Sequence, residues 1–203
     1  VDVYGLDEAM LAMLPQPVRA FILLFPCTEN DEKHRREEDE KLKLSPPEAP
    51  EKLFYMRQYL HNACGTIALF HAILNNLHHI EVKDGPLKSF YEKAKDLTPE
   101  ERGKLLEQDK GVIEIHQSLA REGQTEAPPE DEKVLFHFTA LTNVNGQLYE
   151  LDGRKNFPIA HGETSDDSFV ADAAAVCKKF MARDEKELRF TVMAIAAAAA
   201  GEN

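Results

Sequence analysis

Several residue types and patterns are scarce in this chain of 203 residues. It has no tryptophan, and its three cysteines, Cys27, Cys64 and Cys177, lie far apart. Three distant cysteines suggest neither a disulfide framework nor a CxxC metal site, which favours a reduced compartment, the cytoplasm or also the nucleus. The longest apolar run, residues 192 to 200, is well short of the roughly 20 residues that span a bilayer. Residues 1 to 6 lack the features of a secretory signal. We therefore expect no membrane segment.

Positive charge is also in short supply. The chain has 24 Lys and Arg against 36 Asp and Glu, a formal net charge of -12. Nucleic-acid binding depends on basic patches that displace counterions, so the composition argues against that class. An acidic surface suits a basic partner, although it is also an ordinary route to solubility. The length fits one domain with a substantial core. We expect the protein to be a monomer.

Hydrophobic periodicity predicts a mixture of helices and strands without a βαβ alternation, which favours an α+β fold. Asn62 is expected to cap one helix, and Thr98 with Glu101 forms a capping box for another. Residues 30–43, almost wholly charged, are expected to form a solvated helix or loop. Helices are expected over 6–14, 62–77, 87–97, 98–119 and 168–182, and strands over 18–25, 134–141, 147–153, 157–162 and 188–196.

Cys64 lies in the first turn of the predicted helix 62–77. Unpaired amides and the helix dipole stabilise anions there, so the position favours a reactive thiolate. The alternative is a small buried apolar residue, which is the commoner role of free cysteine. A thiolate nucleophile also needs a histidine base within hydrogen-bond reach. His71 is too far along the same helix, whereas His137 interrupts an otherwise apolar strand and needs a polar partner there.

The turn Asn145-Gly146 supplies that partner. If these are the two loop residues of a hairpin, paired positions sum to 291 and Asp152 faces Thr139. His137 is then a diagonal neighbour of Asp152 on the same face, within hydrogen-bond reach. The alternatives for Asp152 are a turn residue or a slipped register on the opposite face. The amide of Cys64 and the side chain of Gln58 are candidate donors to an oxyanion.

These residues carry a resemblance to a known family. The stretch QYLHNACGT, residues 58–66, resembles the nucleophile motif of the ubiquitin C-terminal hydrolases. The stretch HFTALTNVNGQLYELDGRKNFPIAHG, residues 137–162, resembles their histidine and aspartate block. EGQTEAP and ELRF resemble the loop that crosses the active site and the last strand. The similarity covers nearly the whole length and is closest to the small L-type isozymes.

The resemblance implies a papain-like, knotted fold with an antiparallel sheet between helices, residues 1–203 forming one catalytic domain. It implies Cys64 as nucleophile, His137 as acid and base, Asp152 as orienting carboxylate and Gln58 as oxyanion donor. The implied reaction removes small or unstructured groups from the C-terminal glycine of ubiquitin, and in some members of Nedd8, through a thioester without a metal or cofactor. The crossover loop would be residues 120–133.

The acidic composition fits the arginine-bearing tail of ubiquitin. The candidate contacts to that tail are Asp2, Glu122, Glu126 and Leu188. The family usually begins with a further helix and strand, which this sequence lacks, so a protein that binds ubiquitin without cleaving it is one alternative. A redox-active Cys64 is a second, although no resolving cysteine lies near it in sequence.

Overall fold

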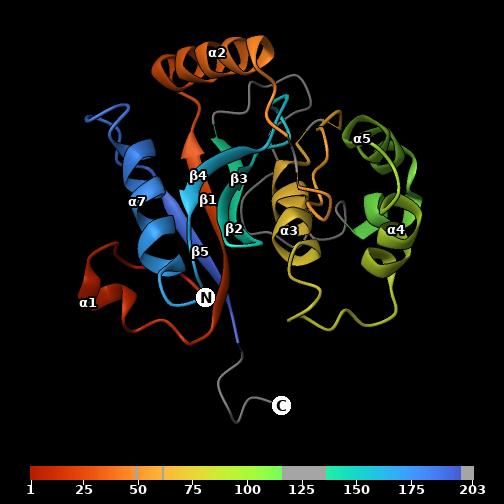
Figure 1. Cartoon of the computed structure of the whole chain (residues 1–203), viewed down its shortest axis with the longest axis horizontal. Helices are drawn as coiled ribbons and strands as arrows, with labels where there is room; N and C mark the ends of the chain where they lie inside the picture. Colours follow the sequence, from red (N-terminus) through yellow and green to blue (C-terminus); the bar gives the residue numbers. More distant parts are fainter. Residues whose placement is uncertain (49, 61, 116–135, 198–203) are drawn as a thin grey trace.

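The computed structural model describes residues 1–48, 50–60, 62–115 and 136–197. Five antiparallel strands form one sheet in the order β4-β3-β2-β1-β5 (Figure 1). The strands are β1 (Val18–Pro26), β2 (Phe136–Val144), β3 (Gln147–Leu151), β4 (Ile159–Glu163) and β5 (Thr191–Ala196). The expected α+β class is confirmed, and the strand ends differ from the predicted ones by a few residues. No described helix is both long enough and apolar enough to cross a membrane.

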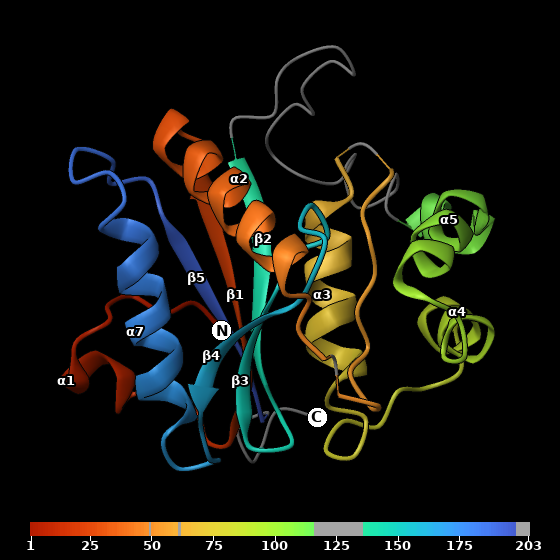
Figure 2. The same ribbon diagram turned by 45° about the horizontal axis from the view of Figure 1, so that its top comes forward.

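Helices cover both faces of the sheet (Figure 2). On one face, α1 (Glu8–Leu11) and α7 (Phe169–Met181) enclose a core in which Phe21, Phe169 and Phe180 pack. On the other, α3 (Cys64–Leu74) packs against β1 and β2, and α4 (Pro86–Ala94) and α5 (Pro99–Gln108) pack outside α3. The cysteine at the start of α3 lies beside the start of β2, next to His137 and Phe138.

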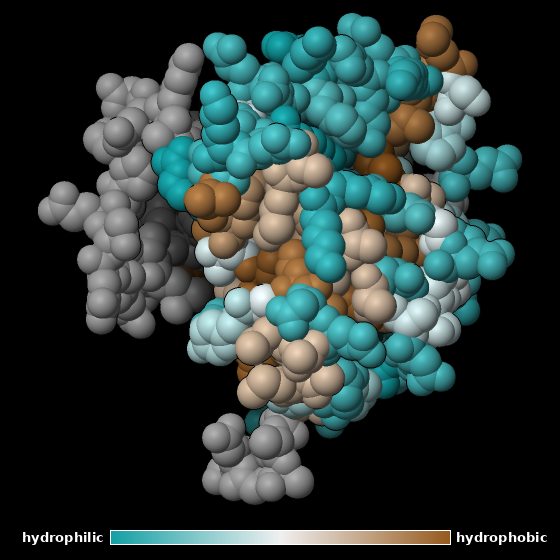
Figure 3. All heavy atoms as spheres, turned by 90° about the vertical axis from the view of Figure 1, so that its left-hand side faces the viewer, coloured by the Kyte–Doolittle hydropathy of each residue, from teal (hydrophilic) through white to brown (hydrophobic). Residues whose placement is uncertain are grey.

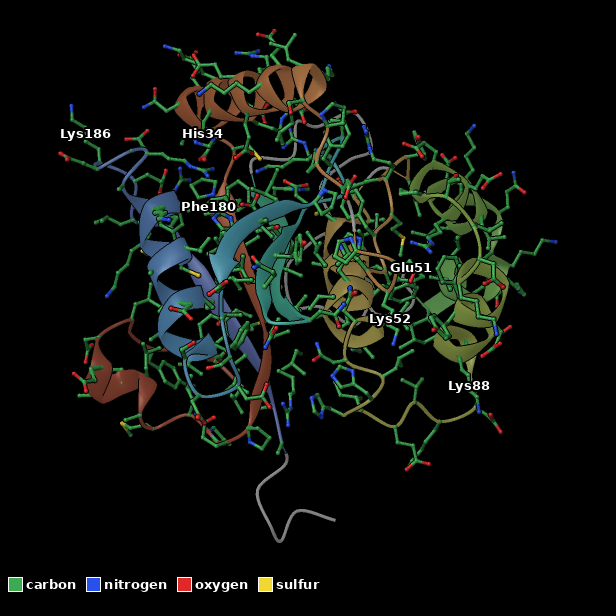
Figure 4. All side chains as sticks on the ribbon, viewed as in Figure 1. His34, Glu51, Lys52, Lys88, Phe180 and Lys186 are labelled. Carbon is green, nitrogen blue, oxygen red and sulfur yellow. The ribbon has the colours of Figure 1, made fainter. Side chains whose placement is uncertain are left out.

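The long charged segment forms α2 (Glu29–Leu44), which begins with Thr28 as its N-cap. It lies across one end of the sheet (Figure 1), and charged side chains radiate from it into solvent (Figure 4). Hydrophilic residues dominate the surface at this end (Figure 3). The inner side of α2 is not simply solvated, because three of its acidic residues form ion pairs with Arg154, Lys155 and Arg183. The pairs with Arg154 and Lys155 hold α2 against the loop that follows β3, and the pair with Arg183 holds it against the segment that follows α7.

The expected start of α3 was wrong. Asn62 has a φ of 58°, so it lies in the left-handed region and does not cap the helix. Ala63 occupies the N-cap position without a side-chain hydrogen bond, and Cys64 is the first helical residue. The helix also ends at Leu74 rather than residue 77. The reason is that the side chains of Asn75 and Asn76 bond back to helix carbonyls, both at 2.8 Å, and onward to other segments.

The predicted helix 98–119 is divided. Its capping box forms as expected, with Thr98 and Glu101 each bonding to the other's backbone. The helix then ends at Gln108, because Asp109 adopts an extended backbone with ψ of 96°. The carboxylate of Asp109 accepts the amide of Val112 at 3.2 Å, so Asp109 caps a second helical segment over 110–115. Residues 116–119 lie outside the described part.

Candidate active site

A cleft of about 1030 Å³ opens between α2, the segment before α3 and the start of β2. It brings Gln58, Cys64 and His137 together from parts of the sequence up to 79 positions apart. Its other walls carry two aromatic residues, Tyr59 and Phe136, and charged residues of α2. Those lining residues include Cys27, Glu32, Lys33, Arg36, Tyr59, Leu60, Asn62, Phe136 and Arg154.

Cys64 is 8% exposed at the first position of α3. Burial opposes ionisation of its thiol, but hydrogen bonds from the side chain of His137 and the amides of Phe138 and Gly65 outweigh it. The net result is a pKa below the usual value for a thiol. The environment therefore favours the thiolate, as the helix start predicted, with His137 as the strongest single partner.

The hairpin register agrees with the prediction. Ala140 faces Leu151 and Val144 faces Gln147, so the paired numbers sum to 291. Asn145 and Gly146 both have positive φ, as a two-residue hairpin turn requires. His137 and Asp152 consequently meet across the two strands. The distance from His137 Nε2 to Asp152 Oδ1 is 2.6 Å.

Charge on Asp152 controls the ionisation of His137. Burial alone would lower the pKa of His137, but the neighbouring carboxylate and the contact with Cys64 raise it to about 9. Burial likewise opposes ionisation of Asp152, but the charge of His137 and the 2.8 Å bond from the Arg154 amide hold its pKa below the usual value. Since Nε2 faces Asp152, Nδ1 is the nitrogen that faces Cys64. The three groups form one buried cluster in which the ionisation of each depends on its neighbour.

The segment before Gln58 is fixed by side chains rather than by a neighbouring strand. The carboxamide of Asn75 makes a two-way bridge to the backbone of Phe54, both bonds at 2.8 Å. His71 Nε2 accepts the amide of Met56 at 3.0 Å. Such bonds place an extended segment as a sheet ladder would, because each buried N–H and C=O needs a partner. His71 is thus a positioning residue in the core, consistent with its exclusion from the site.

Gln58 follows this segment into the cleft. Its amide donates to the carbonyl of Gly153 at 2.8 Å, which ties it to the loop carrying Asp152. The approach is close, since a Cβ on Gly153 would lie 3.0 Å from Gln58 Cβ. Gln58 Nε2 donates one hydrogen bond to the carbonyl of Leu60 at 3.2 Å, and its second N–H has no acceptor among the described residues.

The predicted substrate contacts stand apart from these four residues. Asp2 pairs with Met193 on the outer side of β5, and Leu188 is 86% exposed. Neither lines the cleft. Leu188 precedes Arg189, whose guanidinium lies over the ring of Phe136 at the cleft wall. The structure does not describe residues 116–135, which include Glu122, Glu126 and the predicted crossover loop 120–133. Their assigned roles stay predictions.

Sequence reasoning missed several residues that shape the site. The guanidinium of Arg154 donates to Cys27 Sγ at 3.3 Å and pairs with Glu32, which joins α2 to the cleft wall. The sequence predicts Asn75 only as a residue of the helix 62–77. The sequence holds one indication for Arg154, which lies two positions after Asp152 and next to a second basic residue, Lys155, just beyond an apolar strand. Within the described ranges, no group of three or more His, Cys, Asp or Glu could hold a metal ion.

Comparisons with known proteins agree with this geometry. Residues 1–182 match the family described as ubiquitin carboxyl-terminal hydrolase, family 1. A ubiquitin carboxyl-terminal hydrolase of Drosophila melanogaster is 56% identical over 197 residues, 97% of this chain and 86% of the relative. The L1 isozyme of Rattus norvegicus is 44% identical over 199 residues, 98% of this chain and 87% of the relative.

A solved structure shows the same fold. The catalytic domain of Trichinella spiralis UCH37, bound to ubiquitin vinyl methyl ester, superposes with a TM-score of 0.68 and 26% identity, over 97% of this chain and 84% of that one. This molecule thus combines the papain-like arrangement with the motif around Cys64 and with the block that contains His137 and Asp152. The chain belongs to ubiquitin carboxyl-terminal hydrolase family 1.

Proposed function

We propose that this deubiquitinating cysteine peptidase cleaves small or unstructured groups from the C-terminal glycine of ubiquitin through a thioester on Cys64. The observation that carries the proposal is the buried cluster of Cys64, His137 and Asp152, in which His137 bonds to Asp152 and lowers the pKa of Cys64, at the edge of a cleft. A thiol with a lowered pKa, next to a histidine held by a carboxylate, is the arrangement that nucleophilic acyl transfer needs.

The first half of the reaction forms the acyl-enzyme. The Cys64 thiolate attacks the carbonyl carbon of the terminal glycine, and negative charge develops on the carbonyl oxygen. The second N–H of Gln58 Nε2 and the amide of Cys64 stabilise that oxygen. When the tetrahedral intermediate collapses, the bond to the leaving amine or thiol breaks and His137 protonates the leaving group. The product is a thioester between Cys64 and ubiquitin.

The second half regenerates the enzyme. His137, now neutral, removes a proton from water as the water oxygen attacks the thioester carbonyl. Collapse expels the Cys64 thiolate and releases ubiquitin with a free carboxylate, and His137 is again protonated. Asp152 keeps His137 oriented and stabilises its charged form in both halves, consistent with its effect on the His137 pKa.

The remaining contacts and the setting belong to the same proposal. Asp2, Glu122, Glu126 and Leu188 are proposed to contact the ubiquitin tail, with the loop 120–133 limiting the size of the leaving group. Nedd8 is proposed as a second modifier. The compartment is proposed to be the cytoplasm, or also the nucleus, because all three cysteines are free thiols in the fold.

The test is hydrolysis of ubiquitin bearing a fluorogenic amide at its C-terminus, with the matching Nedd8 substrate beside it. We expect turnover by the wild type and none by Cys64→Ser. Adding hydroxylamine should divert the thioester to a ubiquitin hydroxamate. Tight binding of ubiquitin with no turnover would favour a protein that holds ubiquitin without cleaving it, and would contradict the proposal.

A further inference from the structure

Asn62 has two unusual properties in the described part of the chain. Its backbone lies in the left-handed region, with a φ of 58°. Its side-chain oxygen Oδ1 is buried and has no hydrogen-bond partner among the described residues. It lines the cleft two positions before Cys64. Neither property is explained by the helix, since Ala63 and not Asn62 holds the N-cap position.

The backbone conformation alone does not require asparagine. Glycine adopts a positive φ without a steric penalty, whereas asparagine is only tolerated there. A glycine would also avoid leaving a carboxamide oxygen without a partner, which costs folding free energy because the oxygen has lost its water. Selection of the side chain is therefore better explained by something that enters the cleft. An oxygen accepts hydrogen bonds, so the missing partner is a donor.

We propose that Asn62 is a substrate-binding residue whose Oδ1 accepts the backbone N–H of the terminal glycine, the residue whose carbonyl Cys64 attacks. This inference rests on the proposed function. The substrate tail enters the cleft as an extended peptide, and each of its buried N–H groups needs an acceptor. The glycine N–H belongs to the same residue as the attacked carbonyl, and Asn62 lies two positions before the nucleophile and lines the same cleft. Oδ1 would hold the tail while Gln58 and the Cys64 amide act on the oxyanion.

The variants Asn62→Gly and Asn62→Ala separate the side chain from the backbone. Asn62→Gly keeps the left-handed conformation and removes the carboxamide that carries the acceptor. Asn62→Ala removes the acceptor and adds backbone strain. We expect Asn62→Gly to lower kcat/KM for the ubiquitin amide substrate by about 5- to 100-fold, as for the loss of an acceptor that leaves a buried donor unpaired. Alkylation of Cys64 by iodoacetamide, which has no peptide tail, should stay within about twofold of wild type.

The direct test pairs this variant with a substrate that lacks the donor. Ubiquitin whose terminal glycine is replaced by sarcosine has a methyl group in place of the N–H. We expect wild type to lose activity on this substrate, and Asn62→Gly to cost no more than about twofold there, because the two changes remove the same bond. An undiminished cost of Asn62→Gly on the sarcosine substrate would overturn the assignment.

Two other results would also overturn it. One is wild-type kcat/KM in Asn62→Gly. The other is an equal loss in ubiquitin cleavage and in iodoacetamide alkylation, which would mean that Asn62 acts only through the backbone or through Cys64. Failure of the proposed function looks different, because the wild type itself would then leave the unmodified ubiquitin amide uncleaved.

Discussion

Replacement of Asp152 by asparagine should move the pH at which activity falls. In the proposed mechanism activity requires Cys64 ionised and His137 protonated, so it should rise as pH passes the lowered pKa of Cys64. It falls as pH passes the raised pKa of His137, at about 9. In Asp152→Asn the carboxylate that raises the His137 pKa is gone, while the burial that lowers it remains. The falling limb should therefore shift to lower pH, by about 1 to 3 units.

The size of the loss follows from the same contacts. With His137 largely neutral near pH 8, the leaving group receives no proton, and turnover should fall by about 10²- to 10⁴-fold. Asp152 is 2% exposed and does not line the cleft, so the affinity for ubiquitin should change little. Asn is nearly isosteric with Asp and still offers an oxygen to His137 Nε2 and to the Arg154 amide. The fold should therefore survive the change.

The assay is kcat/KM for a fluorogenic ubiquitin amide measured from about pH 5 to about pH 10, with ubiquitin binding followed separately. Asp84→Asn is the matched control, because the Asp84 side chain is 95% exposed and pairs with Lys88 at the surface. An unchanged falling limb, or wild-type rates, in Asp152→Asn would refute the catalytic assignment of Asp152.

Three predictions concern stability, each measured by urea unfolding. Gly103→Ala should lower the free energy of unfolding by about 1 to 3 kcal/mol, because a Cβ would overlap the carbonyl oxygen of Arg57. Gly111→Ala is the control, since its Cβ would meet only ordinary contacts and should leave the free energy of unfolding unchanged. Equal effects of the two changes would contradict this reasoning. Asn75→Ala should lower the free energy of unfolding by about 2 to 4 kcal/mol, because the buried backbone N–H and C=O of Phe54 lose their hydrogen-bond partner. A smaller loss would mean that water takes the place of the Asn75 side chain. Lys155→Met should lower the free energy of unfolding by up to about 3 to 5 kcal/mol, since it leaves the buried Glu150 with only its bond to His161, whereas the exposed Lys88 (Figure 4) tolerates the same change.

The geometry that brings His137 beside Asp152 was predictable from sequence. The dipeptide Asn145-Gly146 permits a two-residue turn, and the turn fixes the register of every pair in the hairpin. The alternation of side chains then decides which residues share a face. Local rules suffice here because the two partners are only 15 positions apart in the sequence.

Asn62 and the segment before Gln58 were not predictable in the same way. Asparagine is common both as a helix cap and in the left-handed conformation, so residue type alone did not decide between them. The position of Gln58 depends on hydrogen bonds that the side chains of Asn75 and His71, in and just after α3, make to the backbone of the segment before Gln58. No local pattern reports such bonds. The knot implied by the family resemblance stays a prediction.

The most direct measurement of the central claim uses ubiquitin that carries a C-terminal vinyl methyl ester. The electrophile reacts only when the tail is bound and a thiolate lies beside it. Intact mass and peptide mapping should show one adduct, on Cys64, that is lost in Cys64→Ala and retained in Cys27→Ala, although Cys27 lines the same cleft. No adduct, or an adduct on Cys27 or Cys177, would contradict the account.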